Sequence, residues 1–185
     1  MKRIFSIAVA VLCLWILTSN AYASEAPAPW EPAKGDLMVV DTTSNMGYLV
    51  REDLSEGISF QVATGIQRNL NYVGKSYYAA TPSDQWKVKE LDYQIPGYTF
   101  GKEGTFLRLY NDDKRTHYGI HTILDQDWLF SGERYKSWGC ILVSNEMLSL
   151  LEEEFRLNKK SGFTVITLDD ISRFPLKRVA ILTQY

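Results

Sequence analysis

Beyond residue 23 the chain has a single cysteine, Cys140, in the segment Ser137-Trp138-Gly139-Cys140-Ile141. A cysteine acts as a nucleophile when a neighbouring base takes its proton, and histidine is the usual base. The chain has only two histidines, His117 and His121, and both shortly precede Cys140. If they lie on one strand, their spacing puts both on the same side, so either could face the thiol. These residues favour acyl transfer by a cysteine nucleophile.

Gly139 also has a use in such chemistry. Without a Cβ it lets a substrate carbonyl approach, and its N–H and that of Cys140 could donate to a developing oxyanion. Two other interpretations stay open: Cys140 could be a buried, inert thiol, and each histidine an ordinary core or surface residue. A metal site of two histidines and Cys140 would lack an evident fourth ligand, so the sequence predicts neither a metal nor another cofactor.

The N-terminus is typical of a secretory signal peptide over residues 1–23. A basic start precedes an uncharged apolar run at residues 4–17, and Ala21-Tyr22-Ala23 matches a cleavage site. We therefore expect export to the periplasm or cell envelope and no transmembrane segment in the mature chain. An unpaired thiol kept in an oxidising compartment favours a functional role for Cys140.

Composition limits the classes of possible partner and indicates the domain organisation. The chain has 20 basic and 22 acidic side chains, a net charge of −2, which argues against nucleic acid and anionic membranes as partners. Residues 24–35 are rich in proline and alanine and are expected to form a short tether. Residues 36–185 are long enough for one domain whose core needs no disulfide.

Over most of this domain, apolar and polar residues alternate with a period of two, which predicts strands. One segment instead has helical spacing, with Ser144 or Asn145 as its N-cap and Gly162 after its end. Its acidic run Glu152-Glu153-Glu154 is expected on a solvated face. The pattern predicts a mostly β fold, a sandwich or barrel with one main helix. The predicted strands cover residues 37–40, 48–50, 58–62, 86–91, 105–110, 117–121, 163–168 and 178–182.

Several segments together resemble the catalytic domain of the L,D-transpeptidases, the YkuD-like fold. Its signature is a glycine-isoleucine-histidine strand followed, after a loop, by a serine-histidine-glycine-cysteine segment. Each segment alone is weakly specific, but they occur in the family's order over nearly the whole domain. The matching segments are residues 37–41, 60–65, 81–86, Gly119-Ile120-His121-Thr122, 137–141 and 144–147.

The resemblance implies a reaction on the stem peptides of peptidoglycan. A cysteine attacks the carbonyl that precedes D-alanine, D-alanine leaves, and an amine or water resolves the thioester. It also implies acylation by carbapenems. By position, the resemblance implies that Cys140 is the nucleophile and His121 the base, with the Thr122 carbonyl orienting the imidazole. It implies that Gly139 donates to the oxyanion and that Ser137 and Trp138 lie beside the substrate. His117 matches no position that the family requires.

Two departures from the family pattern concern Trp138, where the family has histidine, and Leu142, where it has arginine or asparagine. They predict a more apolar acceptor side, weak crosslinking and more trimming or exchange of D-alanine. A non-catalytic periplasmic protein of the same fold that binds peptidoglycan is the alternative. Four aromatic residues could line the substrate cleft or simply pack: Tyr77, Tyr78, Trp128 and Tyr135.

Overall fold

The computed structural model describes residues 30–184, so the predicted signal peptide and residues 24–29 of the predicted tether lie outside it. Strands dominate, as the alternating pattern predicts. They are, in chain order, β1 (Leu37–Asp41), β2 (Met46–Val50), β3 (Glu56–Gln61), β4 (Thr64–Gly65), β5 (Asn69–Tyr72), β6 (Lys75–Tyr78), β7 (Asp84–Tyr93), β8 (Thr105–Asn111), β9 (Lys114–His121), β10 (Tyr135–Ser137), β11 (Ile141–Leu142), β12 (Phe163–Leu168) and β13 (Ala180–Gln184).

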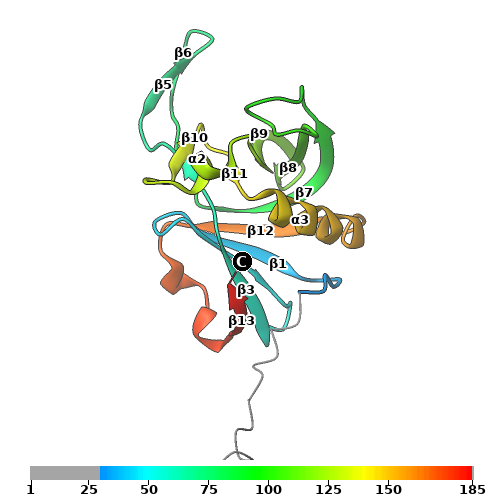
Figure 1. The fold of residues 1–185 in the computed structure, drawn as a ribbon. Coiled ribbons are helices and arrows are strands. Elements are labelled where there is room, and N and C mark those ends of the chain that lie inside the picture. Colours follow the sequence, from blue (N-terminus) through cyan, green and yellow to red (C-terminus); the bar gives the residue numbers. More distant parts are fainter. Residues whose placement is uncertain (1–29, 185) are drawn as a thin grey trace, which may run out of the picture.

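Nine of these strands form one mixed sheet in the order β11-β9-β8-β7-β12-β1-β2-β3-β13, which curls into a half-barrel (Figure 1). Its pairs β11–β9, β12–β1 and β13–β3 are parallel, and the others are antiparallel. β10 pairs with β4, and β5 with β6, in two small separate sheets. The predicted mostly β fold is confirmed.

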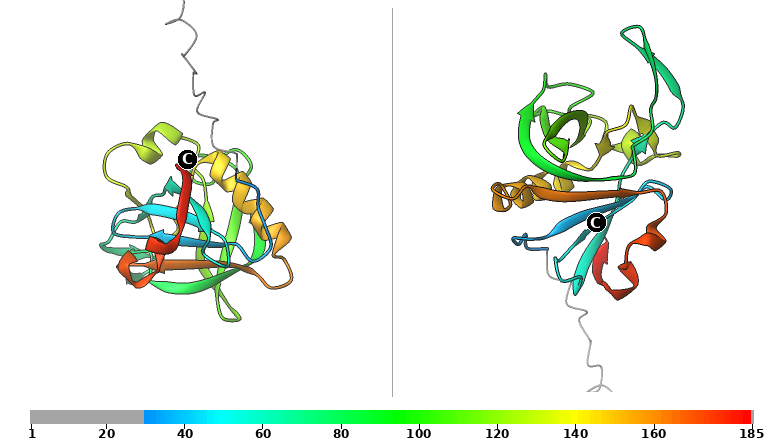
Figure 2. Two further views of the ribbon diagram at one scale, coloured as in Figure 1. Left: turned by 90° about the horizontal axis from the view of Figure 1, so that it is seen from below. Right: turned by 180° about the vertical axis from the view of Figure 1, so that it is seen from behind.

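The main helix, α3 (Asn145–Leu157), begins where the sequence predicts. The Ser144 side chain accepts a hydrogen bond from the Met147 backbone N–H at 3.1 Å, and Asn158 caps the other end. Its apolar side packs into the core that the curled sheet encloses (Figure 2). The shorter elements are α2 (Gln126–Phe130) and the 3₁₀ turns η1 (Ile171–Arg173) and η2 (Leu176–Arg178). No helix within residues 30–184 is long and apolar enough to span a membrane.

Packing of the domain begins earlier than the predicted boundary at residue 36. Trp30 is buried in the main core, its Nε1 donates to Glu154 Oε1 at 3.1 Å, and the Arg51 guanidinium lies 3.8 Å from the centre of its ring. A tryptophan supplies enough apolar area to hold this segment on the domain. The expected tether is therefore part of the folded unit from residue 30 onward.

The prediction that Glu154 lies on a solvated face is wrong. Its side chain is fully buried, and within the described part of the chain its Oε2 meets no hydrogen-bond donor. Burial, together with the neighbouring Asp36 carboxyl, raises its pKa to about 8, although the Trp30 hydrogen bond lowers it. Two facing carboxyl groups without a donor between them need a proton, so Glu154 is neutral at pH 7.

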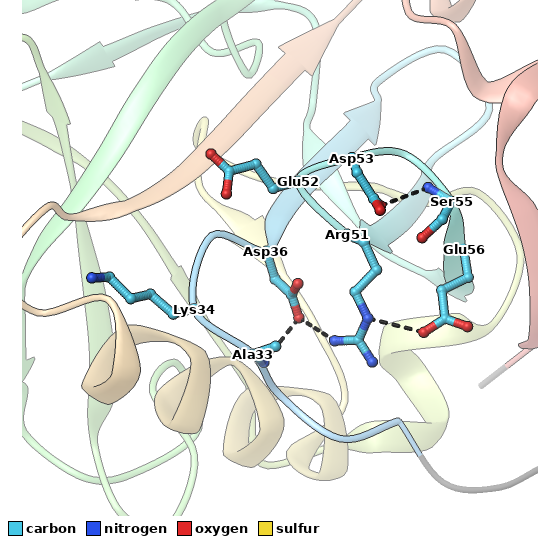
Figure 3. A pocket seen from close by; sticks show the side chains of 8 residues that line it. All are labelled: Ala33, Lys34, Asp36, Arg51, Glu52, Asp53, Ser55 and Glu56. Atoms are coloured by element: carbon cyan, nitrogen blue, oxygen red, sulfur yellow. Dashed lines mark hydrogen bonds and ion pairs between the residues drawn. The ribbon is translucent and has the colours of Figure 1, made fainter.

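Asp36 itself borders a hollow of about 480 Å³ at the surface (Figure 3). The Arg51 guanidinium bonds Asp36 at 2.6 Å and Glu56 at 3.0 Å, so these two carboxylates of the lining share one cation. The hollow is formed by residues 33–56, away from the cysteine segment in the sequence, and carries no candidate nucleophile.

We expect stability to fall as pH rises from about 5 to about 8, because Glu154 keeps its proton when folded and loses it when unfolded. In that window the unfolded chain binds fewer protons than the folded one, which lowers the free energy of unfolding. Glu154→Gln should flatten this dependence of the melting temperature, and exposed Glu153→Gln should not. An equal slope in the Glu154 variant would contradict the assignment.

Candidate active site

His121 ends β9 and Cys140 directly precedes β11, the neighbouring strand at one edge of the curled sheet. β11 runs parallel to β9, with Ile141 opposite Ile120 and Leu142 opposite His121. Continuing this register by one residue puts Cys140 beside Gly119, whose backbone hydrogen-bonds it. Because side chains alternate along a strand, Cys140 and His121 share one face of the sheet. The register thus puts the predicted nucleophile and base on the same face of neighbouring segments of the chain.

The His121 imidazole has a fixed orientation. Its Nδ1 lies 2.9 Å from the backbone oxygen of Thr122, as the resemblance implies. A carbonyl only accepts hydrogen bonds, so the Thr122 contact assigns the proton to Nδ1 and leaves Nε2 as the basic nitrogen. The ring stacks on Phe106, with centroids 5.3 Å apart and planes at 19°, and Phe100 lies 4.9 Å away.

The Phe106 ring explains why residue 119, two positions before His121, is a glycine. A Cβ at this position would lie 1.9 Å from the Phe106 ring, where no side chain fits. Phe106 in turn is opposite His121 in the register of β8 and β9. The glycine therefore lets Phe106 lie flat beneath the imidazole, which holds His121 in place.

Burial keeps the Cys140 thiol and the His121 imidazole neutral. It lowers the pKa of His121 to about 4, although backbone hydrogen bonds with Thr122 and Thr99 oppose this. It raises the pKa of the half-buried Cys140 thiol to about 11, against the Gly119 hydrogen bond and the charge of Arg108. At pH 7 the site therefore holds a thiol and a neutral imidazole rather than an ion pair.

Arg108 is a part of the site that the sequence analysis did not single out. It is buried, and its Nε and Nη2 bond Asp92 Oδ2 at 2.9 and 2.6 Å. It lies opposite Gly119 in the register, so it shares the face of Cys140 and favours the thiolate. The sequence feature that could have identified Arg108 is a charged residue within an otherwise apolar strand.

Two hydroxyl groups hold the loop that carries the nucleophile. Ser137 Oγ donates to the Cys140 carbonyl at 2.6 Å and accepts from the Gly139 N–H at 3.0 Å, and Thr81 Oγ1 donates to the same carbonyl at 3.5 Å. Gly139 has a φ of +120°, and a Cβ there would lie 2.5 Å from the Tyr118 ring. The Gly139 N–H is thus bonded to Ser137, and its predicted oxyanion role requires it to exchange that partner.

Searches at the level of sequence find no matching family model and no matching curated protein. Solved structures do match. An L,D-transpeptidase from Xylanimonas cellulosilytica has a TM-score of 0.53 and 18% identity, covering 79% of this chain and 66% of that one. The protein Bd1075 of Bdellovibrio bacteriovorus has a TM-score of 0.51 and 16% identity, covering 78% of this chain and 53% of that one. The chain has the L,D-transpeptidase fold. It spans two thirds or less of each of these structures.

Within this L,D-transpeptidase fold, Trp138 stands beside the nucleophile and is 58% exposed. Its ring contacts that of Tyr72 edge to face, with centroids 5.7 Å apart. His117 is also exposed, and its backbone oxygen accepts from Arg108 at 3.4 Å. Among residues 30–184 no group of three or more His, Cys, Asp or Glu side chains is arranged to hold a metal ion.

The four aromatic residues that could line the substrate cleft have different surroundings in the L,D-transpeptidase fold. The Cys140 thiol adds to the effect of burial in raising the pKa of Tyr77, which places this hydroxyl near the nucleophile. Tyr78 follows it on the other face of the hairpin. Trp128 packs against Lys136, and the Tyr135 hydroxyl donates to the Thr43 carbonyl at 2.9 Å. Of these four, Tyr77 is the residue whose pKa Cys140 influences.

The prediction that Leu142 makes the acceptor side apolar is wrong. Leu142 is only 3% exposed and packs in a small core cluster with Ala63, Ile123 and Leu129. It lies opposite His121 in the strand register, but its side chain packs in this core cluster, where an apolar side chain is expected. Of the two departures from the family pattern, only Trp138 is exposed.

We therefore expect Leu142→Arg to destabilise the protein by on the order of 3 kcal/mol or more, because it would bury an unpaired charge. Trp138→His, at an exposed position, should change the free energy of unfolding by less than about 0.5 kcal/mol. Urea denaturation of the two variants checks this. Equal stability of the Leu142 variant and the wild type would show that this side chain can reach solvent.

Proposed function

We propose that this protein is a cysteine acyltransferase of the L,D-transpeptidase type, exported to the cell envelope and acting on peptidoglycan stem peptides. The observation that carries the proposal is the position of Cys140, directly before β11, on the face that His121 of the neighbouring parallel strand β9 occupies, with the Thr122 carbonyl bonded to the imidazole. A nucleophile, a base and a group that orients the base are the parts that acyl transfer by cysteine needs.

In the first step the Cys140 sulfur attacks the carbonyl that precedes D-alanine. The thiol proton passes to His121 Nε2 and then to the departing amine, the C–S bond forms, and the C–N bond breaks. In the second step water or an amine attacks the thioester. It gives a proton to His121, the C–S bond breaks, and the proton returns to the sulfur. The products are D-alanine and a trimmed, exchanged or crosslinked peptide.

The neutral resting pair affects the timing of the first proton transfer. With the thiol pKa near 11 and the imidazole pKa near 4, a preformed thiolate is strongly disfavoured. The proton therefore moves as the sulfur attacks, when negative charge passes to the substrate oxygen. Donors for that oxygen are the Cys140 N–H and, once released from Ser137, the Gly139 N–H.

A second candidate is a peptidoglycan-binding protein that keeps the fold without the reaction. The raised pKa of Cys140 favours it, because a protonated thiol is a poor nucleophile. The bond between the Gly139 N–H and Ser137 favours it as well.

Purified disaccharide-tetrapeptides, incubated with the protein and analysed by mass, distinguish the two candidates. The enzyme releases D-alanine and yields tripeptides, exchanged peptides or dimers, and Cys140→Ala yields none of them. An unchanged tetrapeptide in both incubations would support the binding protein and overturn the proposed reaction.

A further inference from the structure

The β5–β6 hairpin stands off the curled sheet, on the side where β10 and α2 lie (Figures 1 and 2). Its two-residue turn, Val73-Gly74, has φ values of +49° and +73°, which is the pattern of a type I′ turn. The hairpin is joined to the cysteine segment at its base, where the Ile66 N–H donates to the Ser137 carbonyl at 3.0 Å. It is thus a defined projection beside the nucleophile.

The strand register separates the hairpin's side chains onto two faces. Tyr72 pairs with Lys75 and Leu70 with Tyr77, so these four lie on one face. The Ala79 N–H donates to the Arg68 carbonyl at 2.9 Å, which continues the ladder and adds Arg68 to the same face. We call this the inner face. The other face holds Asn69, Asn71, Ser76 and Tyr78.

The inner face is turned toward the nucleophile. Tyr72 contacts Trp138 with ring planes at 63°, and the pKa of Tyr77 is raised by burial, by Cys140 and by Tyr72. Tyr72 and Trp138 are nevertheless 59% and 58% exposed, so their rings present free surface next to the cysteine. Such rings are common anchors for a ligand because they bury large area at low entropic cost.

Charge is distributed unevenly around this face. Residues 57–83 contain no Asp or Glu, in a chain whose acidic side chains outnumber its basic ones. The basic residues of that stretch, Arg68 and Lys75, are both exposed on the inner face. Neither forms an ion pair with any residue between 30 and 184. Uncompensated cations beside exposed rings suit an anionic ligand.

We propose that the inner face and Trp138 bind the donor stem peptide, with Tyr72 and Trp138 on its apolar parts and Lys75 and Arg68 on its free carboxylates. This rests on the proposed function, since it identifies the peptide as the donor. The surface explains why a tryptophan, which carries no charge of its own, precedes Gly139: the cations lie on the hairpin opposite it.

Binding of a disaccharide-tetrapeptide to the Cys140→Ala protein, measured by calorimetry, tests this surface without turnover. Tyr72→Ala should weaken binding about tenfold and Lys75→Ala about three- to fivefold, the latter less at high salt. Tyr78→Ala is the matched control on the outer face, at 57% exposure, and Lys159→Ala the control for a distant exposed lysine. Both controls should bind within about twofold of the parent protein. A peptide with amidated carboxylates should bind more weakly and be insensitive to Lys75→Ala.

Parent-like binding by the Tyr72 and Lys75 variants, or equal losses in Tyr72→Ala and Tyr78→Ala, would overturn the proposal. Turnover by the wild type with a KM unchanged in Tyr72→Ala would overturn it too and leave the reaction intact. Conversely, Tyr72- and Lys75-dependent binding without release of D-alanine would support this surface and contradict the proposed reaction. The melting temperatures of all variants should match that of the parent.

Discussion

Replacing Cys140 by alanine is expected to abolish release of D-alanine, and His121→Ala to lower it by roughly 10²- to 10⁴-fold. The thiol makes the bond to the acyl group, so nothing substitutes for it. The imidazole moves the proton, and Nε2 is the nitrogen that the Thr122 contact leaves basic. Rates of D-alanine release from a tetrapeptide by the purified variants check both values.

His117→Ala is the matched control for the base. His117 lies on the same strand but is exposed, and its backbone, not its ring, bonds Arg108. Its replacement should change the rate less than about twofold, as is usual for a surface substitution. A His117 variant as slow as the His121 variant would mean that the base is assigned to the wrong residue.

The second large effect is on thiol reactivity. Because burial raises the pKa of Cys140 to about 11, alkylation by iodoacetamide should be slow at pH 7 and accelerate about tenfold for each pH unit up to about 10. In urea-unfolded protein the thiol regains an ordinary pKa of about 8.5, and the rate should level off above about pH 9. The measurement is the rate of mass increase across this pH range.

A folded protein whose alkylation rate is already high and constant near pH 7 would contradict the neutral pair. It would mean that Cys140 and His121 form a thiolate–imidazolium pair, as the histidine's position alone suggests. The proposed order of proton transfer would then be replaced by attack of a preformed thiolate.

The elements that position the site were predictable because their signals are local. Alternating patterns identified the strands that carry His121 and Phe106, and a capping serine identified the start of α3. The placement of Cys140 and His121 on one face followed from motif order and from alternation along a strand. These features depend on neighbours in the sequence.

The features that the sequence analysis missed or misjudged depend on distant contacts. Glu154 sits in a run of three glutamates, and only the packing of Trp30 and Asp36 against α3 makes it buried and protonated. Leu142 follows the nucleophile by two residues, yet its partners Ala63 and Leu129 come from other segments. The hairpin's short strands lack a buried face of their own, so their pattern was too weak to identify.

The central claim is that Cys140 forms a thioester with an acyl donor, and intact-mass spectrometry with a carbapenem tests it most directly. The strained lactam carbonyl takes the place of the stem-peptide carbonyl, and no leaving group is lost on ring opening. We predict one adduct of the full carbapenem mass on the wild type and none on Cys140→Ala. A wild-type protein that stays unmodified after long incubation, while its thiol is accessible to iodoacetamide at high pH, would contradict the account.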